Sequence, residues 1–131
     1  MGAPKKILIV DDTRYVREIT GLMLRKRGFE VIFAVNGNEG YEKATSQNPD
    51  LIILDVMMPG RDGFDICNSL KTTEEYKHIP IILLTAIADG TELTDEDVRR
   101  KAGADDCLSK PFEPRELYAR VEKLLGAPEP D

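Results

Sequence analysis

The sequence has few of the features that mark secreted, membrane-spanning or nucleic-acid-binding proteins. It contains only two cysteines, Cys67 and Cys107, with no CxxC spacing, so we expect a reducing, cytoplasmic environment. No apolar run approaches the roughly 20 residues that span a bilayer. Lys and Arg, 18 in all, are outnumbered by 24 Asp and Glu, and the formal charge is −6. Because phosphate backbones require clustered basic residues, we expect no direct contact with nucleic acid. The lack of a long apolar run predicts no contact with a membrane.

The chain does contain the alternation that is typical of α/β proteins. Its 131 residues suffice for one domain with its own core. Short apolar runs alternate with amphipathic segments, which indicates repeated βα units around a parallel sheet. The runs are mostly continuous, as expected for strands covered on both faces. The expected strands are residues 7–10, 31–35, 51–54, 81–84 and 107–109. The prediction is a doubly wound α/β fold with a central five-stranded parallel sheet.

The helices and their ends are visible as apolar faces and capping residues. The apolar faces are Val16, Ile19 and Met23 in the first helix and Leu117, Val121, Leu124 and Leu125 in the last. Thr94 and Asp97 have the spacing of a capping box, which predicts a helix that ends near Ala102. Gly28, Gly103 and Gly126 indicate helix stops, and Pro114 suits a first helical position. We expect a tail at 1–5, a domain at 6–126 and a tail or linker start at 127–131.

Five polar side chains come directly after the expected strands: Asp11, Asp12, Asp55, Thr85 and Lys110. In an open α/β sheet the ligand site lies beyond the carboxyl ends of the strands, so these side chains are expected to converge. Two unit charges 4 Å apart repel by roughly 4 kcal/mol at an effective dielectric near 20, so three carboxylates need a cation. Oxygen ligands with an open coordination shell suit Mg²⁺, and Mn²⁺ could substitute.

Four short stretches carry a resemblance to a known family. They are Ile9-Val-Asp-Asp12, Leu54-Asp-Val-Met-Met-Pro-Gly60, Leu84-Thr-Ala86 and Ser109-Lys-Pro-Phe112. In this order and at this spacing, the chain resembles the receiver domains of two-component response regulators, from Lys6 to about Leu125. The resemblance implies a flavodoxin-like (βα)5 fold with strand order 2-1-3-4-5.

The resemblance also implies a phosphoacceptor function. A histidine kinase or a histidine phosphotransfer protein would donate a phosphoryl group to Asp55, giving an acyl phosphate. Asp12, Asp55 and the Met57 backbone carbonyl would bind the metal directly, and Asp11 would act through water. The domain would then catalyse only its own phosphorylation and dephosphorylation. Met57 and Ile87, two residues beyond Asp55 and Thr85, are apolar and cannot orient water, which predicts slow self-dephosphorylation.

The phosphoryl group would be held by side chains and backbone together. Thr85 can donate a hydroxyl hydrogen bond, and Lys110 can place an ammonium against the phosphoryl oxygens. Backbone N–H groups of Met57 and Ala86 should complete the site. By resemblance the Lys110–Pro111 peptide bond is cis, although most X-Pro bonds in folded proteins are trans.

The residues that would change conformation on phosphorylation show the clearest departure from the family pattern. The family couples movement of Thr85 to an aromatic side chain three residues before the lysine, and here that place holds Cys107. Free cysteine is most often a small buried hydrophobe, so the switch could rely on the Thr85 loop and the following helix. By resemblance, the face of the fourth helix, fifth strand and fifth helix would contact a downstream output domain or protein, or form a homodimer.

Two other functions remain open from the sequence. A Mg²⁺-dependent small-molecule phosphohydrolase also uses an aspartate nucleophile, but it needs a general acid nearby and Met57 occupies the relevant place. A binding platform independent of phosphorylation should lack a pocket residue, and none is missing. The single histidine, His78, is expected to be a plain surface residue rather than a phosphate donor.

Overall fold

The computed structural model describes residues 4–56, 63–86 and 94–126. Strands and helices alternate along these residues, as predicted. The strands are β1 Lys6–Val10, β2 Glu30–Ala34, β3 Leu51–Asp55, β4 Ile81–Thr85 and β5 Asp106–Ser109. The helices are α1 Arg14–Lys26, α2 Gly37–Ser46, α3 Gly63–Lys71, α4 Asp95–Ala102 and α5 Pro114–Leu125.

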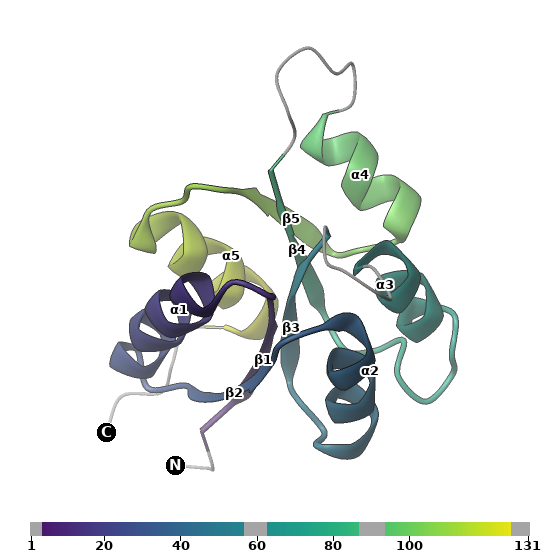
Figure 1. Cartoon of the computed structure of the whole chain (residues 1–131), viewed down its shortest axis with the longest axis horizontal. Coiled ribbons are helices and arrows are strands. Elements are labelled where there is room, and N and C mark those ends of the chain that lie inside the picture. The colour runs from purple at the N-terminus through teal and green to yellow at the C-terminus, as the bar shows by residue number, and fades with distance from the viewer. Residues whose placement is uncertain (1–3, 57–62, 87–93, 127–131) are drawn as a thin grey trace.

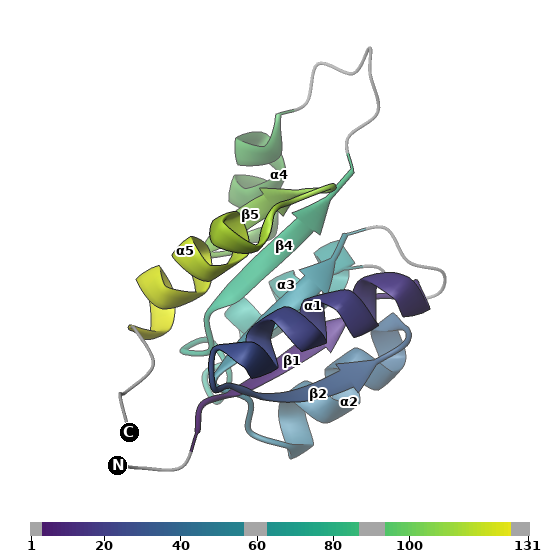
Figure 2. The same ribbon diagram turned by 90° about the vertical axis from the view of Figure 1, so that its left-hand side faces the viewer.

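The five strands form one parallel sheet in the order β2-β1-β3-β4-β5. This confirms both the doubly wound fold and the strand order implied by the resemblance. Helices α1 and α5 cover one face, while α2, α3 and α4 cover the other (Figure 1). Seen from the side, the strands run between the two layers and all point in one direction (Figure 2). The carboxyl ends of β1, β3 and β4 therefore lie at one edge.

Strand β3 shows why the apolar runs are continuous. Leu51 and Ile53 lie in the core cluster that includes residues of α1 and α5, whereas Ile52 and Leu54 lie in the cluster that includes residues of α2, α3 and α4. All four side chains are buried. Because successive side chains of a strand point to opposite faces, a strand covered on both faces needs apolar residues at every position.

The strand boundaries differ from the predicted ones by one residue. Strand β2 begins at Glu30, which is in register with Lys6 of β1, and Val35 lies beyond its end with 43% of its surface exposed. As an edge strand, β2 has a weaker apolar pattern, so its register is less evident from sequence. Asp55 and Thr85 are the last residues of their strands rather than the residues that follow them.

The predicted helix ends are confirmed. Thr94 accepts a hydrogen bond from the Asp97 N–H at 3.1 Å, and the Asp97 carboxylate accepts one from the Thr94 N–H at 3.0 Å. Helix α4 ends at Ala102 and is followed by Gly103, whose φ of 80° is left-handed, and Pro114 begins α5. Among the described residues, no helix is both long and apolar enough to cross a membrane.

Candidate functional site

Three carboxylates meet at the carboxyl edge of the sheet. Asp11 and Asp12 follow β1 directly, and Asp55 ends the neighbouring strand β3. One oxygen from each of the three carboxylates lies within 4.8 Å of the others. Among the residues that the structure describes, this acidic trio is the only group of three or more His, Cys, Asp or Glu side chains close enough to share an ion. The sheet topology thus brings together the acidic residues that the sequence predicted.

Asp11 is the most firmly anchored member of the trio. Its side chain is fully buried, whereas that of Asp12 is exposed. Its Oδ1 accepts a hydrogen bond from the Thr13 N–H at 2.8 Å, a local side-chain bond in the turn that precedes α1. Its own N–H donates to the Ala34 carbonyl at 3.2 Å, which ties β1 to the end of β2. These contacts leave Asp11 little freedom to move.

Lys110 supplies the positive charge of the site. It follows β5, and its Nζ lies 2.9 Å from Asp11 Oδ2 and 3.2 Å from Asp55 Oδ2. Burial alone would lower the pKa of Lys110, but the hydrogen bond and charge of Asp11, followed by those of Asp55, raise it. Lys110 therefore stays protonated and offsets part of the repulsion within the acidic trio.

Thr85 is the last residue of β4, next along the chain to Leu84, which is in register with Asp55 of β3, and its side chain is buried. Its carbonyl accepts a hydrogen bond from the Lys110 N–H at 2.8 Å, which couples the ends of β4 and β5. Ala86 follows directly and is exposed. The Lys110–Pro111 peptide bond is cis.

Two residues that sequence reasoning missed lie against the site. Arg17 on α1 donates a hydrogen bond from Nη1 to the Asp11 carbonyl at 2.8 Å. Gly63 begins α3 directly against β3, where an added Cβ would lie 2.2 Å from the Asp55 carbonyl oxygen. Neither contact has a local sequence signal, because both depend on how a helix packs against a distant strand.

The two cysteines are buried parts of the core. Cys107 lies on the side of the sheet covered by α2, α3 and α4, in the same cluster as Val98 of α4. Cys67 on α3 is fully buried, and this burial raises the pKa of its thiol to about 12. The Cys67 thiol is therefore neutral at physiological pH, as expected of a buried structural cysteine.

Two residues assigned roles from the sequence lie outside the described residues: Met57, expected to contribute its backbone carbonyl and N–H, and Ile87, expected to affect dephosphorylation. The other residues that the sequence predicted for the pocket lie within the described residues: Asp11, Asp12, Asp55, Thr85, Ala86 and Lys110.

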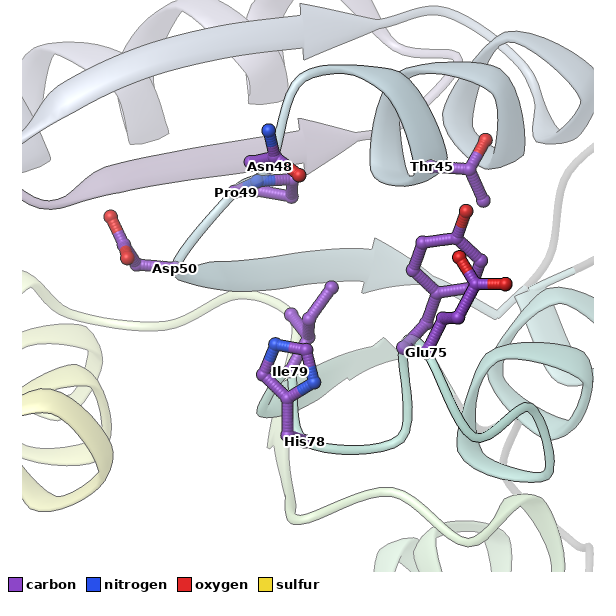
Figure 3. A pocket seen from close by; sticks show the side chains of 8 residues that line it. Thr45, Asn48, Pro49, Asp50, Glu75, His78 and Ile79 are labelled. Atoms are coloured by element: carbon purple, nitrogen blue, oxygen red, sulfur yellow. The ribbon is translucent and has the colours of Figure 1, made fainter.

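A hollow of about 500 Å³ lies at the opposite, amino end of the sheet (Figure 3). It lies between the end of α2 and the segment before β4, and the exposed His78 lies at its edge. Its lining residues are Thr45, Asn48, Pro49, Asp50, Glu75, Tyr76, His78 and Ile79. None of them belongs to the acidic trio, so the trio and this hollow are separate features.

Comparisons with known proteins identify the family of the chain. The family model described as response regulator receiver domain matches residues 7–122. A sensor histidine kinase receiver domain from Pseudomonas aeruginosa, with magnesium coordinated in its active-site cleft, has a TM-score of 0.83 and 30% identity, covering 95% of this chain and all of that one. A histidine kinase receiver domain from Syntrophus aciditrophicus has a TM-score of 0.82 and 36% identity, covering 92% and 89% of the two chains.

A curated sequence relative is longer than this chain. The alkaline phosphatase synthesis transcriptional regulatory protein PhoP of Bacillus subtilis is 41% identical over 121 residues, 92% of this chain and 48% of that protein. The chain thus spans about half the length of the curated relatives it matches.

Proposed function

The chain belongs to the response regulator receiver domain family, and we propose that it is a phosphoacceptor signalling module in which Asp55 takes the phosphoryl group. The observation that carries this proposal is the setting of the Asp55 carboxylate. It lies at the carboxyl end of β3, grouped with two further carboxylates and 3.2 Å from the Lys110 ammonium. This arrangement can hold a cation and a phosphoryl group side by side.

In the proposed reaction, the donor is a phosphohistidine of a histidine kinase or a histidine phosphotransfer protein. A carboxylate oxygen of Asp55 attacks the phosphorus, the bond from phosphorus to the imidazole nitrogen breaks, and its electron pair stays on the imidazole. The Lys110 ammonium, the Thr85 hydroxyl and the N–H groups of Ala86 and Met57 would stabilise the charge on the phosphoryl oxygens.

The acidic trio fits Mg²⁺ by its chemistry. Its ligands are carboxylate oxygens, which Mg²⁺ prefers, and Asp12 is exposed enough to leave room for water. We propose that Asp12, Asp55 and the Met57 carbonyl bind the ion. We propose that Asp11, whose Oδ1 accepts the Thr13 N–H and whose Oδ2 forms an ion pair with Lys110, contacts the ion through water. Bound Mg²⁺ would neutralise the charge of the incoming phosphoryl group, and Mn²⁺ accepts the same ligands.

Phosphorylation would be read out on the face made by α4, β5 and α5. The added charge on Asp55 would draw the Thr85 hydroxyl toward it, and Thr85 is joined to the end of β5 through Lys110. Cys107 lies in the same core cluster as Val98 of α4 but is small. We therefore propose that the movement reaches the surface through the segment after Thr85 and through α4, rather than through a swinging aromatic ring.

The family match supports a proposal for the cellular setting. We propose a receiver domain over 6–126 that acts in the cytoplasm on an output domain or protein or through a homodimer. Met57 and Ile87 cannot guide a water by hydrogen bonding, so the phosphoryl group should be lost slowly. The family match argues against a small-molecule phosphohydrolase and against a platform that works without phosphorylation.

Intact-mass measurement tests the proposal. We expect wild-type protein to gain one phosphoryl group from acetyl phosphate in the presence of Mg²⁺, and to gain none in EDTA. Asp55→Asn should gain none in either condition, with unchanged folding by circular dichroism. Equal labelling of Asp55→Asn and wild type would refute Asp55 as the acceptor.

A further inference from the structure

Arg17 is distinguished from the other arginines of α1 by its partner. Arg14 forms an ion pair with Glu18 of the same helix, and the Arg25 guanidinium lies over the ring of Phe33 in β2. Arg17 instead donates from Nη1 to the Asp11 carbonyl at 2.8 Å. It forms an ion pair with none of the described residues. Its charged donor is thus directed at the backbone of the acidic trio.

This hydrogen bond fixes more than Asp11. A peptide unit is planar, so the Asp11 carbonyl and the Asp12 N–H move as one rigid group. The Asp11 side chain is held by Thr13 and Lys110, and its N–H by Ala34. The Arg17 hydrogen bond also constrains the orientation of the peptide plane that joins Asp11 to Asp12. Asp12 is exposed, and among the residues that the structure describes its carboxylate forms no ion pair that would orient it.

The positive charge of Arg17 would by itself work against cation binding. A guanidinium close to a metal site repels the metal, so a purely electrostatic role predicts that its removal strengthens Mg²⁺ binding. A positioning role predicts the opposite, because partners that orient metal ligands contribute to affinity without touching the metal. The two roles therefore differ in the sign of one measurable quantity.

We infer that Arg17 is a positioning residue for the proposed Mg²⁺ site, holding the peptide plane between Asp11 and Asp12 so that the Asp12 carboxylate is preset toward Asp55. The inference rests on the proposed function, since it concerns the same acidic trio. If Arg17 has this role, the position of α1 affects the affinity of the site for Mg²⁺.

Calorimetric titration of the metal-free protein with MgCl₂ tests this inference. We expect Arg17→Met to weaken binding by about tenfold, the lower end of losses seen for outer partners of metal ligands. Arg17→Lys, which keeps a charged donor, should remain within about threefold of wild type. Arg14→Met removes the same charge from the same helix and should bind equally or more tightly. Thermal unfolding in EDTA checks that each variant is folded.

Each outcome of the titration is decisive. Unchanged or tighter Mg²⁺ binding by Arg17→Met would overturn the inference, and tighter binding would indicate a purely electrostatic role. If Arg17→Met does not fold, Arg17→Gln replaces it; it removes the guanidinium donor, so weaker binding supports the inference and equal or tighter binding overturns it. Absence of Mg²⁺ binding by the wild-type protein would instead refute the proposed metal site itself.

Discussion

At the scale of single residues, Gly63 leaves no room for a Cβ atom. A Cβ there would lie 2.2 Å from the Asp55 carbonyl oxygen and 2.9 Å from the Val56 Cα, and backbone cannot yield as a side chain can. We expect Gly63→Ala to lower the free energy of unfolding by about 1–3 kcal/mol, as overpacking does, and to slow phosphorylation of Asp55. Urea denaturation measures the loss. Gly28→Asn is the control, because nothing lies within 4 Å of a Cβ there and asparagine tolerates positive φ. A Gly63→Ala variant as stable as wild type would contradict the close approach.

Cys67 makes a pH-dependent prediction. Burial raises the pKa of its thiol from 9.0 to about 12. Because the folded-state pKa is raised, the buried neutral thiol contributes its full stabilisation below about pH 9. That stabilisation is lost as the pH rises toward 12, since the unfolded chain then releases the proton more readily. Since the thiolate is the reactive form, Cys67 in a Cys107→Ala background should resist iodoacetamide at about pH 9 and react once urea unfolds the chain. Rapid alkylation of the folded protein would show that the thiol is not shielded.

At the scale of elements, the two threonine N-caps should behave differently. Thr94 makes a reciprocal capping box with Asp97, whereas the Thr13 side chain makes no capping hydrogen bond at the start of α1. Thr94→Ala should therefore destabilise α4 by about 1 kcal/mol, while Thr13→Ala should change stability little. Hydrogen exchange measured by mass spectrometry should show faster exchange in α4 with β4 unaffected. Equal effects of the two substitutions would rule out the box as the stabilising feature of α4.

The strands and helix ends that the sequence predicted well are those whose local residue pattern directly reflects their burial or capping. Strand β3 is covered on both faces, so its run of Leu and Ile leaves no other assignment. Strand β2 lies at an edge, with Ile32 and Phe33 only half-buried, and its predicted boundaries were shifted by one residue. The capping box at Thr94 was evident because capping depends on residues close in sequence.

At the scale of the whole molecule, the acidic site was predictable because the sheet topology brings its residues together. Parallel strands place their carboxyl ends at one edge, so residues as far apart as Asp11 and Lys110 were expected to meet. Their detailed pairing was not predictable: Lys110 lies closer to Asp11 than to Asp55. The contact of Arg17 depends on how α1 lies against the sheet, which no local pattern encodes.

The charge of the trio should couple metal binding to global stability. Asp12 is the exposed member, and none of the described residues forms an ion pair with it, whereas Lys110 pairs with both others. In EDTA we expect Asp12→Asn to raise the free energy of unfolding by about 1 kcal/mol through relief of repulsion. Mg²⁺ at 100 times its Kd should stabilise wild type by about 2.7 kcal/mol, and Asp12→Asn should lose this gain.

Thermal unfolding in EDTA and in MgCl₂ gives both quantities for the two proteins. A lower Tm of Asp12→Asn in EDTA would contradict the repulsion. Equal stabilisation of wild type and Asp12→Asn by Mg²⁺ would place the ion elsewhere.

The central claim is that Asp55 forms an acyl phosphate, and borohydride trapping followed by peptide mass mapping tests it most directly. Borohydride reduces an acyl phosphate to an alcohol, so phosphorylated protein should yield homoserine at position 55, with Asp11 and Asp12 unchanged. Protein treated in EDTA should yield none. Homoserine at position 11 or 12 instead, or a borohydride-resistant phosphate on a hydroxyl or on His78, would contradict the account.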